Sequence, residues 1–149
     1  MSEKENAELI LEVIDAVEER DAERLFANYH EEVEFYDASS LPYGGSFRGK
    51  AEIVARFFED PDDTWLGTWG PLQPTETERR MDPRIVATSG DEVVVLYNQR
   101  ALGPNGERFD GPCMGLYEVR EGKLARAQMF HYDTAAIADF LRRARAERS

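Results

Sequence analysis

The stretch KLARAQMFHYD, Lys123–Asp133, is a strand of alternating character that runs directly into a predicted helix. Because alternate side chains of a strand share a face, Met129, His131 and Asp133 are expected on the same side. A carboxylate beside an imidazole fixes its tautomer and raises its basicity, so this pair suits proton transfer. Aspartate is also a favoured N-cap, and the following Thr134–Ile137 has helical character. Asp133 therefore has two possible roles, catalytic and structural.

Three further β-rich runs precede this strand, and turns of the kind that join antiparallel strands separate them. The runs are Thr75–Ser89, Glu92–Leu102 and Arg108–Arg120. The second half of the chain is therefore predicted to form a long antiparallel sheet.

The first half of the chain is mainly helical by periodicity. Apolar residues at three- and four-residue spacing predict a first helix around Leu9–Val17. A second helix is predicted to begin after Asp21 and to end near His30, followed by a strand at Val33–Tyr36. A third helix is predicted between Gly49 and Pro61. Helices and strands thus segregate along the chain.

Two segments rich in turn-forming residues are predicted as loops. Ala38–Gly45 could form the rim of a pocket, with Tyr43 reaching over its mouth. Glu59–Pro74 contains Trp65 and Trp69, and it is either a lid or a loop anchored by these tryptophans. Its acidic residues lack the ligand spacing of a calcium loop, so no metal site is expected there.

Residues 1–149 are predicted to form one α+β domain, since helices and strands segregate instead of alternating. A closing helix carries the apolar stripe Ile137, Phe140 and Leu141. The predicted architecture is a cone-shaped, curved antiparallel sheet wrapped around three N-terminal helices, with the C-terminal helix completing it. The hollow between helices and sheet is the expected ligand site.

The composition excludes several classes of partner. Eighteen basic and thirty acidic residues give a formal net charge of −12, which disfavours nucleic acid and anionic membranes. The N-terminal residues lack the apolar core of a signal peptide, so a soluble cytoplasmic protein is expected. Cys113 is the single cysteine and is expected to be a buried apolar residue rather than part of a disulfide or a metal site.

The order of elements, the strand Val33–Asp37, the segments Leu41–Gly45 and Phe47–Gly49, and the hairpin Gly115–Leu124 together resemble the nuclear-transport-factor-2-like superfamily. The resemblance covers nearly the whole chain and is strongest to the SnoaL-like and ketosteroid-isomerase-like members. That superfamily includes isomerases, polyketide cyclases, epoxide hydrolases, dehydratases and binding proteins without chemistry. The resemblance implies a homodimer, and no cofactor is expected.

The isomerase and hydrolase patterns match this sequence only in part. Resemblance to the ketosteroid isomerases places their general-base aspartate on Asp37. Their two oxyanion donors fall near Val13 and Gly115, which carry no side-chain donor. Resemblance to limonene-type epoxide hydrolases places their polar triad on Leu96, Asn98 and Met129, so that triad is absent.

The SnoaL-like cyclases carry a His-aromatic-Asp triplet on the last strand, and His131-Tyr132-Asp133 reproduces this pattern. The triplet lies four residues later than in the family when counted from the preceding turn. Counting by distance places the base at Met129, and counting by pattern places it at Asp133.

These alignments also set the expected orientation of the two central strands. Leu96, Asn98 and Arg100 are predicted to face inward, as are Cys113, Gly115 and Tyr117. Asn98 is then either a polar group of the cavity or a strand-end residue bonded to backbone. The opposite face, with Val93, Val95, Tyr97 and Gln99, is expected to be an outer homodimer interface.

The leading hypothesis is a cofactor-independent acid–base enzyme acting on a small hydrophobic metabolite by isomerisation, cyclisation, dehydration or hydrolysis. The base is Asp37, or His131 supported by Asp133. Residues expected to contact the substrate are Tyr43, Trp65, Asn98, Cys113 and Met129. The alternative is a noncatalytic ligand-binding or dimeric scaffold. The incomplete isomerase and hydrolase patterns favour this alternative.

Overall fold

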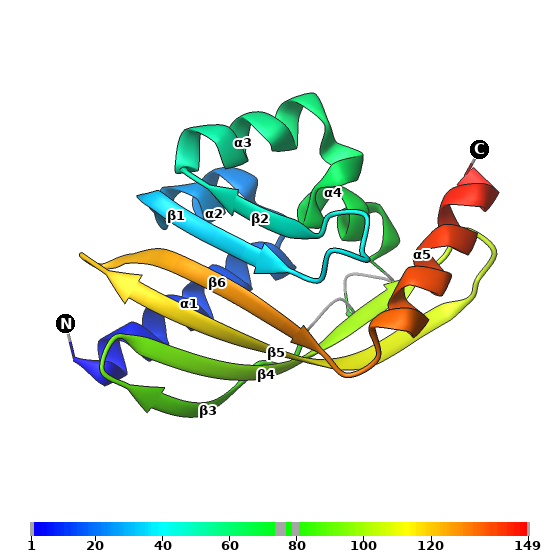
Figure 1. The fold of residues 1–149 in the computed structure, drawn as a ribbon. Helices are drawn as coiled ribbons and strands as arrows, with labels where there is room; N and C mark the ends of the chain where they lie inside the picture. Colours follow the sequence, from blue (N-terminus) through cyan, green and yellow to red (C-terminus); the bar gives the residue numbers. More distant parts are fainter. Residues whose placement is uncertain (1, 74–76, 79–80, 149) are drawn as a thin grey trace.

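A curved six-stranded sheet forms one wall of the molecule, and α1 to α4 lie against its inner face (Figure 1). The computed structural model describes residues 2–73, 77–78 and 81–148. In chain order the elements are α1 (Glu3–Glu18), α2 (Ala22–Ala27), β1 (Tyr29–Asp37), β2 (Gly45–Arg48), α3 (Lys50–Glu59), η1 (Pro61–Asp63), α4 (Trp65–Trp69), η2 (Gly70–Leu72), β3 (Arg84–Ser89), β4 (Glu92–Leu102), β5 (Arg108–Arg120), β6 (Lys123–His131) and α5 (Thr134–Arg148). The predicted α+β class is confirmed.

The strand order is β2-β1-β6-β5-β4-β3, and every neighbouring pair is antiparallel except β1 and β6. These two strands run parallel, with Tyr36 opposite Gln128. The antiparallel sheet predicted for the second half of the chain is confirmed in β3 to β6, and the parallel contact of β1 with β6 is an addition that the sequence did not predict. The strands β1 and β6 are separated by most of the chain, and the residue pattern within a strand does not encode which neighbour it meets.

The phase of β4 differs from the prediction by one residue. Val93, Val95, Tyr97 and Gln99 are buried on the inner face, and Asn98 lies on the other face. A period of two fixes the alternation but not its phase, and a one-residue slip moves every side chain to the opposite face. The expected cavity role of Asn98 is therefore wrong. The predicted outer interface of Val93, Val95, Tyr97 and Gln99 is also wrong, because these side chains are buried inside the molecule.

The N-terminal helices begin and end at identifiable signals. A capping box of Ser2 and Glu5 starts α1, whose apolar side packs against the sheet. Asp21 caps α2 through the backbone N–H of Arg24, but this helix ends at Ala27, so β1 begins earlier than predicted. The third predicted helix is present as α3.

The segment 59–74, predicted as a loop, contains three short helices, η1, α4 and η2. The hydroxyl of Thr64 accepts a hydrogen bond of 3.1 Å from the backbone N–H of Gly67 and so caps α4. The predicted strand at 75–89 is present only as β3, and residues 74–76 and 79–80 lie outside the described part. The turn-forming residues of the segment 59–74 led to the prediction of a loop, although Thr64 caps a short helix there.

Two apolar cores are present. The larger one lies between the sheet and the helices α1 to α3. The smaller one lies under α5, which crosses the far end of the sheet (Figure 1). Trp69 and Phe140 stack there with ring centroids 6.3 Å apart. In the described ranges, no helix combines the length and the apolar character needed to cross a membrane.

Candidate functional site

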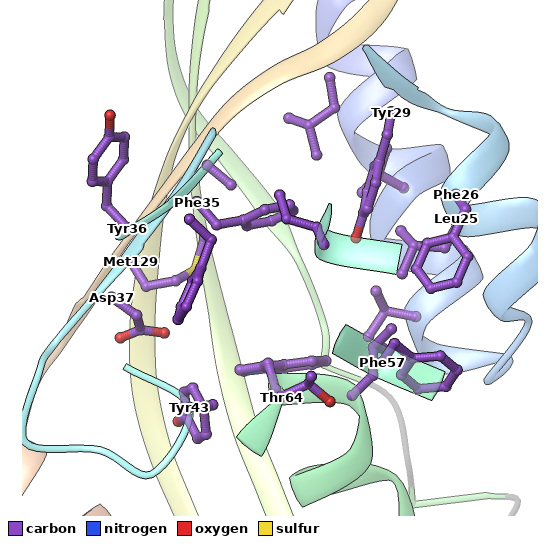
Figure 2. Close-up of a pocket in the computed structure, with 18 of the residues that line it drawn as sticks. Leu25, Phe26, Tyr29, Phe35, Tyr36, Asp37, Tyr43, Phe57, Thr64 and Met129 are labelled. Atoms are coloured by element: carbon purple, nitrogen blue, oxygen red, sulfur yellow. The ribbon is translucent and has the colours of Figure 1, made fainter. Parts of the chain in front are cut away.

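A cavity of about 160 Å³ lies between the helices and the inner face of the sheet (Figure 2). Its wall is mostly aromatic and aliphatic and includes Val13, Leu25, Phe26, Tyr29, Phe35, Phe57, Trp65, Tyr97, Tyr117 and Met129. Asp37 and Tyr43 lie together at one side, and Leu25, Phe26 and Phe57 lie at the other (Figure 2). The Asp37 carboxylate therefore lies across the cavity from a group of apolar side chains.

Asp37 is the last residue of β1 and lines the cavity. Its Oδ1 accepts a hydrogen bond of 2.7 Å from the backbone N–H of Ala38 and lies 2.8 Å from Nε2 of His131. Among the described residues, no hydrogen bond reaches Oδ2. One carboxylate oxygen is thus fixed by protein groups, and the other is open to a ligand.

His131 is the last residue of β6, the parallel neighbour of β1. Because parallel strands end at the same edge of a sheet, Asp37 and His131 meet although they are 94 positions apart. The His131 side chain is only 1% exposed, against 11% for Asp37. It does not line the cavity, so it acts on the cavity only through its neighbours.

The charge of His131 follows from these neighbours. Burial lowers the pKa of His131, but hydrogen bonds to Asp37 and Cys113 outweigh it and raise the pKa to about 10. At neutral pH the ring is therefore an imidazolium, and it cannot accept a further proton.

A line of side chains continues from the other ring nitrogen. Nδ1 of His131 lies 3.3 Å from Sγ of Cys113, and this thiol donates to the hydroxyl of Tyr97 at 3.0 Å. The hydroxyl of Tyr97 in turn donates to Sδ of Met129 at 3.1 Å. Cys113 is buried next to His131 but does not line the cavity, whereas Tyr97 and Met129 do.

Four tyrosines surround the cavity: Tyr29, Tyr43, Tyr97 and Tyr117. Burial raises the pKa of each hydroxyl, so all four stay protonated and can donate hydrogen bonds. The negative charge of Asp37 further raises the pKa of Tyr43. Within the described chain, the Tyr43 hydroxyl makes no hydrogen bond of normal geometry, and its neighbour Trp69 counteracts part of the rise in pKa.

Gly115 makes room for one of these tyrosines. A Cβ atom at this position would lie 2.5 Å from the ring of Tyr117, so any larger residue here would displace this ring. The missing side chain at Gly115, which removes the oxyanion donor expected from the isomerase pattern, thus admits a tyrosine hydroxyl into the cavity.

The structure places Asp133 away from the cavity. It is exposed, and its Oδ1 accepts a hydrogen bond of 3.0 Å from the backbone N–H of Ala136, as an N-cap of α5 does. The expected support of His131 by Asp133 is therefore wrong, because the chain leaves the strand at Tyr132 and turns into the helix. Asp37 takes that position instead.

Of the residues expected to contact a substrate, Tyr43, Trp65 and Met129 line the cavity, and Cys113 and Asn98 do not. Sequence reasoning missed Tyr29 and Tyr97 as cavity residues. The second predicted helix includes Tyr29, whereas α2 ends at Ala27 and Tyr29 begins β1. The predicted orientation of β4 turns Tyr97 outward, whereas its side chain lines the cavity. The alternation of β4 indicates which side chains share a face, but it does not tell which of the two faces is buried.

No group of three or more His, Cys, Asp or Glu side chains that could hold a metal ion occurs in the part of the chain described. The polar side chains that line the cavity include the carboxylates of Asp37 and Asp63, the guanidinium of Arg56 and the tyrosine hydroxyls.

A curved sheet closed by N-terminal helices around an internal cavity is the architecture of the nuclear-transport-factor-2-like superfamily. The profile of the SnoaL-like domain matches residues 10–127, so the chain belongs to the SnoaL-like family. No match is found among curated proteins.

Three solved structures illustrate the likeness. TerC, crystallised with polyporic acid, has a TM-score of 0.72 and 23% identity, covering 93% of this chain and 98% of TerC. An NTF2-like protein of unknown function from Burkholderia pseudomallei has a TM-score of 0.72 and 22% identity, covering 95% and 98%. A candidate polyketide cyclase from Pseudomonas putida has a TM-score of 0.66 and 19% identity, covering 90% and 96%. At these identities the likeness concerns the fold.

Proposed function

We propose that this protein is a cofactor-independent enzyme that moves a proton on a small hydrophobic substrate, as isomerases and cyclases do, with Asp37 as the base. The observation that carries the proposal is the carboxylate of Asp37, held by His131 and Ala38 through Oδ1 while Oδ2 is open to an apolar cavity. A base needs a free lone pair within reach of the substrate.

The charge of His131 decides between the two candidate bases. An imidazolium whose side chain is 1% exposed cannot take a proton from a ligand in the cavity. Its Nε2 lies 2.8 Å from Oδ1 of Asp37 and so holds this carboxylate in place. His131 is thus a positioning residue, and Asp37 is the group that touches the substrate.

The aromatic wall and the neutral hydroxyls indicate the kind of substrate. A flat or cyclic hydrophobic compound would pack against the rings, and its carbonyl oxygen would accept a hydrogen bond from a tyrosine hydroxyl. Asp37 would then remove a proton from the carbon next to that carbonyl. The proton returns from the protonated Asp37 to another carbon or oxygen of the substrate, so no co-reactant is consumed.

Hydrogen exchange in D₂O tests this proposal without knowledge of the final product. Wild-type protein is incubated with a panel of hydrophobic cyclic ketones and quinones that includes polyporic acid, and loss of carbon-bound hydrogen is followed by NMR. Asp37→Asn should slow exchange by about 10²-fold or more, since general-base catalysis typically contributes that much. Unchanged exchange in this variant would overturn the assignment.

Asp37→Asn leaves a buried imidazolium without its anion, so a second variant guards against loss of fold. Asp37→Asn combined with His131→Gln replaces the ion pair by two amides. It should remain folded by circular dichroism and remain inactive. If instead wild-type protein binds compounds of the panel, seen by calorimetry, but exchanges none of their hydrogens, the noncatalytic ligand-binding role is the correct one.

We also propose a second copy of the chain as partner, seated on the outer face of the sheet. Met114 on β5 and Phe130 on β6 are paired in register on this face, and they are 36% and 50% exposed. Adjacent exposed apolar side chains of this size are typical of an interface.

A further inference from the structure

The buried ring of His131 contacts both the carboxylate of Asp37 and Sγ of Cys113, which begins the line of side chains described above. We propose that the Tyr97 hydroxyl donates a hydrogen bond to an oxygen atom of the ligand. His131 supports this donor through Cys113, and it also supports the base, Asp37. The inference rests on the proposed function for the role of Asp37, but its geometry is independent of that role.

The direction of the hydrogen bonds follows from the end of the line. The thioether of Met129 can only accept, so the single proton of the Tyr97 hydroxyl points to it. The Tyr97 oxygen then accepts from the thiol of Cys113. With its proton used in this way, the sulfur of Cys113 accepts from Nδ1–H of His131.

The other nitrogen of His131 completes the arrangement. With both nitrogens protonated, Nε2–H donates to Asp37 at 2.8 Å. The hydrogen bonds therefore run outward from the imidazolium in two directions. One goes from Nε2–H to Asp37, and the other goes from Nδ1–H through Cys113 to Tyr97. Hydrogen bonds aligned in one direction polarise one another, so the Tyr97 hydroxyl becomes a stronger donor.

Both ends of this line open onto the cavity, while its middle is sealed. Asp37, Tyr97 and Met129 line the cavity, and Cys113 is 2% exposed. A thioether is a weak acceptor, whereas a carbonyl or enolate oxygen is a strong one. A ligand oxygen that reaches the Tyr97 hydroxyl would therefore replace Met129 Sδ as the acceptor of its hydrogen bond.

The surroundings keep Tyr97 protonated. The groups that face the line are Asp37 from β1, Cys113 from β5 and, on the inner face of β5, Tyr117. Burial and these neighbours together raise the pKa of Tyr97 well above its ordinary value. The hydroxyl thus remains a donor throughout the pH range in which the protein would work.

The first test needs no ligand and no turnover. The protein has two histidines, and His30→Gln leaves the imidazole ¹⁵N signals of His131 alone in the NMR spectrum. We expect both ring nitrogens of His131 to carry protons at pH 7. Cys113→Ala should lower the pKa of His131 by about one unit, and Cys113→Ser, which keeps an acceptor, should restore it. A neutral His131, or one indifferent to Cys113→Ala, would contradict the proposal.

The second test uses 4-nitrophenol as a probe with an aromatic ring and an ionisable oxygen. Its binding is followed by absorbance. Tyr97→Phe should weaken binding about tenfold, the equivalent of one lost hydrogen bond of about 1.4 kcal/mol. Cys113→Ala should weaken it less, and Cys113→Ser should restore it. Tyr132→Phe is the matched control, because this side chain is 85% exposed and does not line the cavity, and binding should stay within about twofold. Tyr117→Phe and Tyr29→Phe remove the hydroxyls of two other cavity residues, and each should weaken binding less than Tyr97→Phe does.

A larger loss in Tyr117→Phe or Tyr29→Phe than in Tyr97→Phe would assign the donor to that tyrosine and overturn the proposal. Absence of 4-nitrophenol binding to the wild-type protein would also count against it. Failure of the proposed function is separate: hydrogen exchange that does not depend on Asp37 would remove Asp37 as base while the NMR result stands.

Discussion

At the scale of single residues, His131 has the most constrained environment in the site. Its ring is held between a carboxylate at 2.8 Å and a thiol at 3.3 Å, and both contacts favour its charged form. Opposite charges in a partly dry site interact more strongly than at the surface. The protonation of one ring is therefore coupled to the stability of the whole fold.

The raised pKa of His131 predicts how stability depends on pH. The folded protein holds the His131 proton up to about pH 10, whereas the unfolded chain releases it near the ordinary value of 6.5. The contribution of this group is fully present below pH 6.5 and is lost as the pH rises through 10. We expect the free energy of unfolding, measured in urea, to fall between these pH values.

His131→Gln should flatten this slope, because glutamine does not titrate. His30→Gln is the matched control: His30 contacts Glu121 near the surface, and its removal should leave the slope almost unchanged. An equally steep decrease in His131→Gln would assign the pH dependence to other groups.

The sequence identified both members of the Asp37–His131 pair but not the pair itself. Asp133 lies two positions from His131 and was the natural local partner, whereas Asp37 lies 94 positions away. Alternation within a strand predicts which side chains share a face and not which strand lies beside it. The pairing depends on the parallel contact of β1 and β6, which no local pattern encodes.

At the scale of elements, Asp133 directly precedes α5 and caps it, and replacing this residue tests the cap. Asp133→Ala removes the acceptor for the backbone N–H of Ala136 and should lower the free energy of unfolding by about 1 kcal/mol. Hydrogen exchange of a substrate should be unaffected, because the side chain is exposed and remote from the cavity lining.

Asp133→Ser is the matched control, since serine also caps helices well. It should retain most of the stability in urea unfolding. A strong loss of exchange activity in both variants would return Asp133 to the catalytic machinery.

Most elements were predictable because their signals are local. The periodicity of α1, the glycine turns between β4, β5 and β6, and the stripe of α5 each arise from neighbouring residues. The phase of β4 and the short helix α4 were not, because burial by distant elements and a single threonine cap decide them.

At the scale of the whole molecule, the outer face of the sheet predicts assembly. Phe130→Lys places a charge in the proposed interface and should convert a dimer to a monomer, measured by size-exclusion chromatography with light scattering. Phe58→Lys is the control: Phe58 is 70% exposed on α3, away from this face, and the variant should remain dimeric. A wild-type protein that is already monomeric at micromolar concentration would contradict the proposed partner.

The parallel pairing of β1 and β6 also determines when the site can form during folding. Asp37 leaves the ribosome long before His131, and its strand stays without this neighbour until β6 has been made. Contacts between such distant parts of a chain form late, because loop closure must come first. We therefore expect the carboxylate and the imidazole to meet only near the end of folding, so a partly folded chain would have neither the Asp37–His131 pair nor a complete cavity wall.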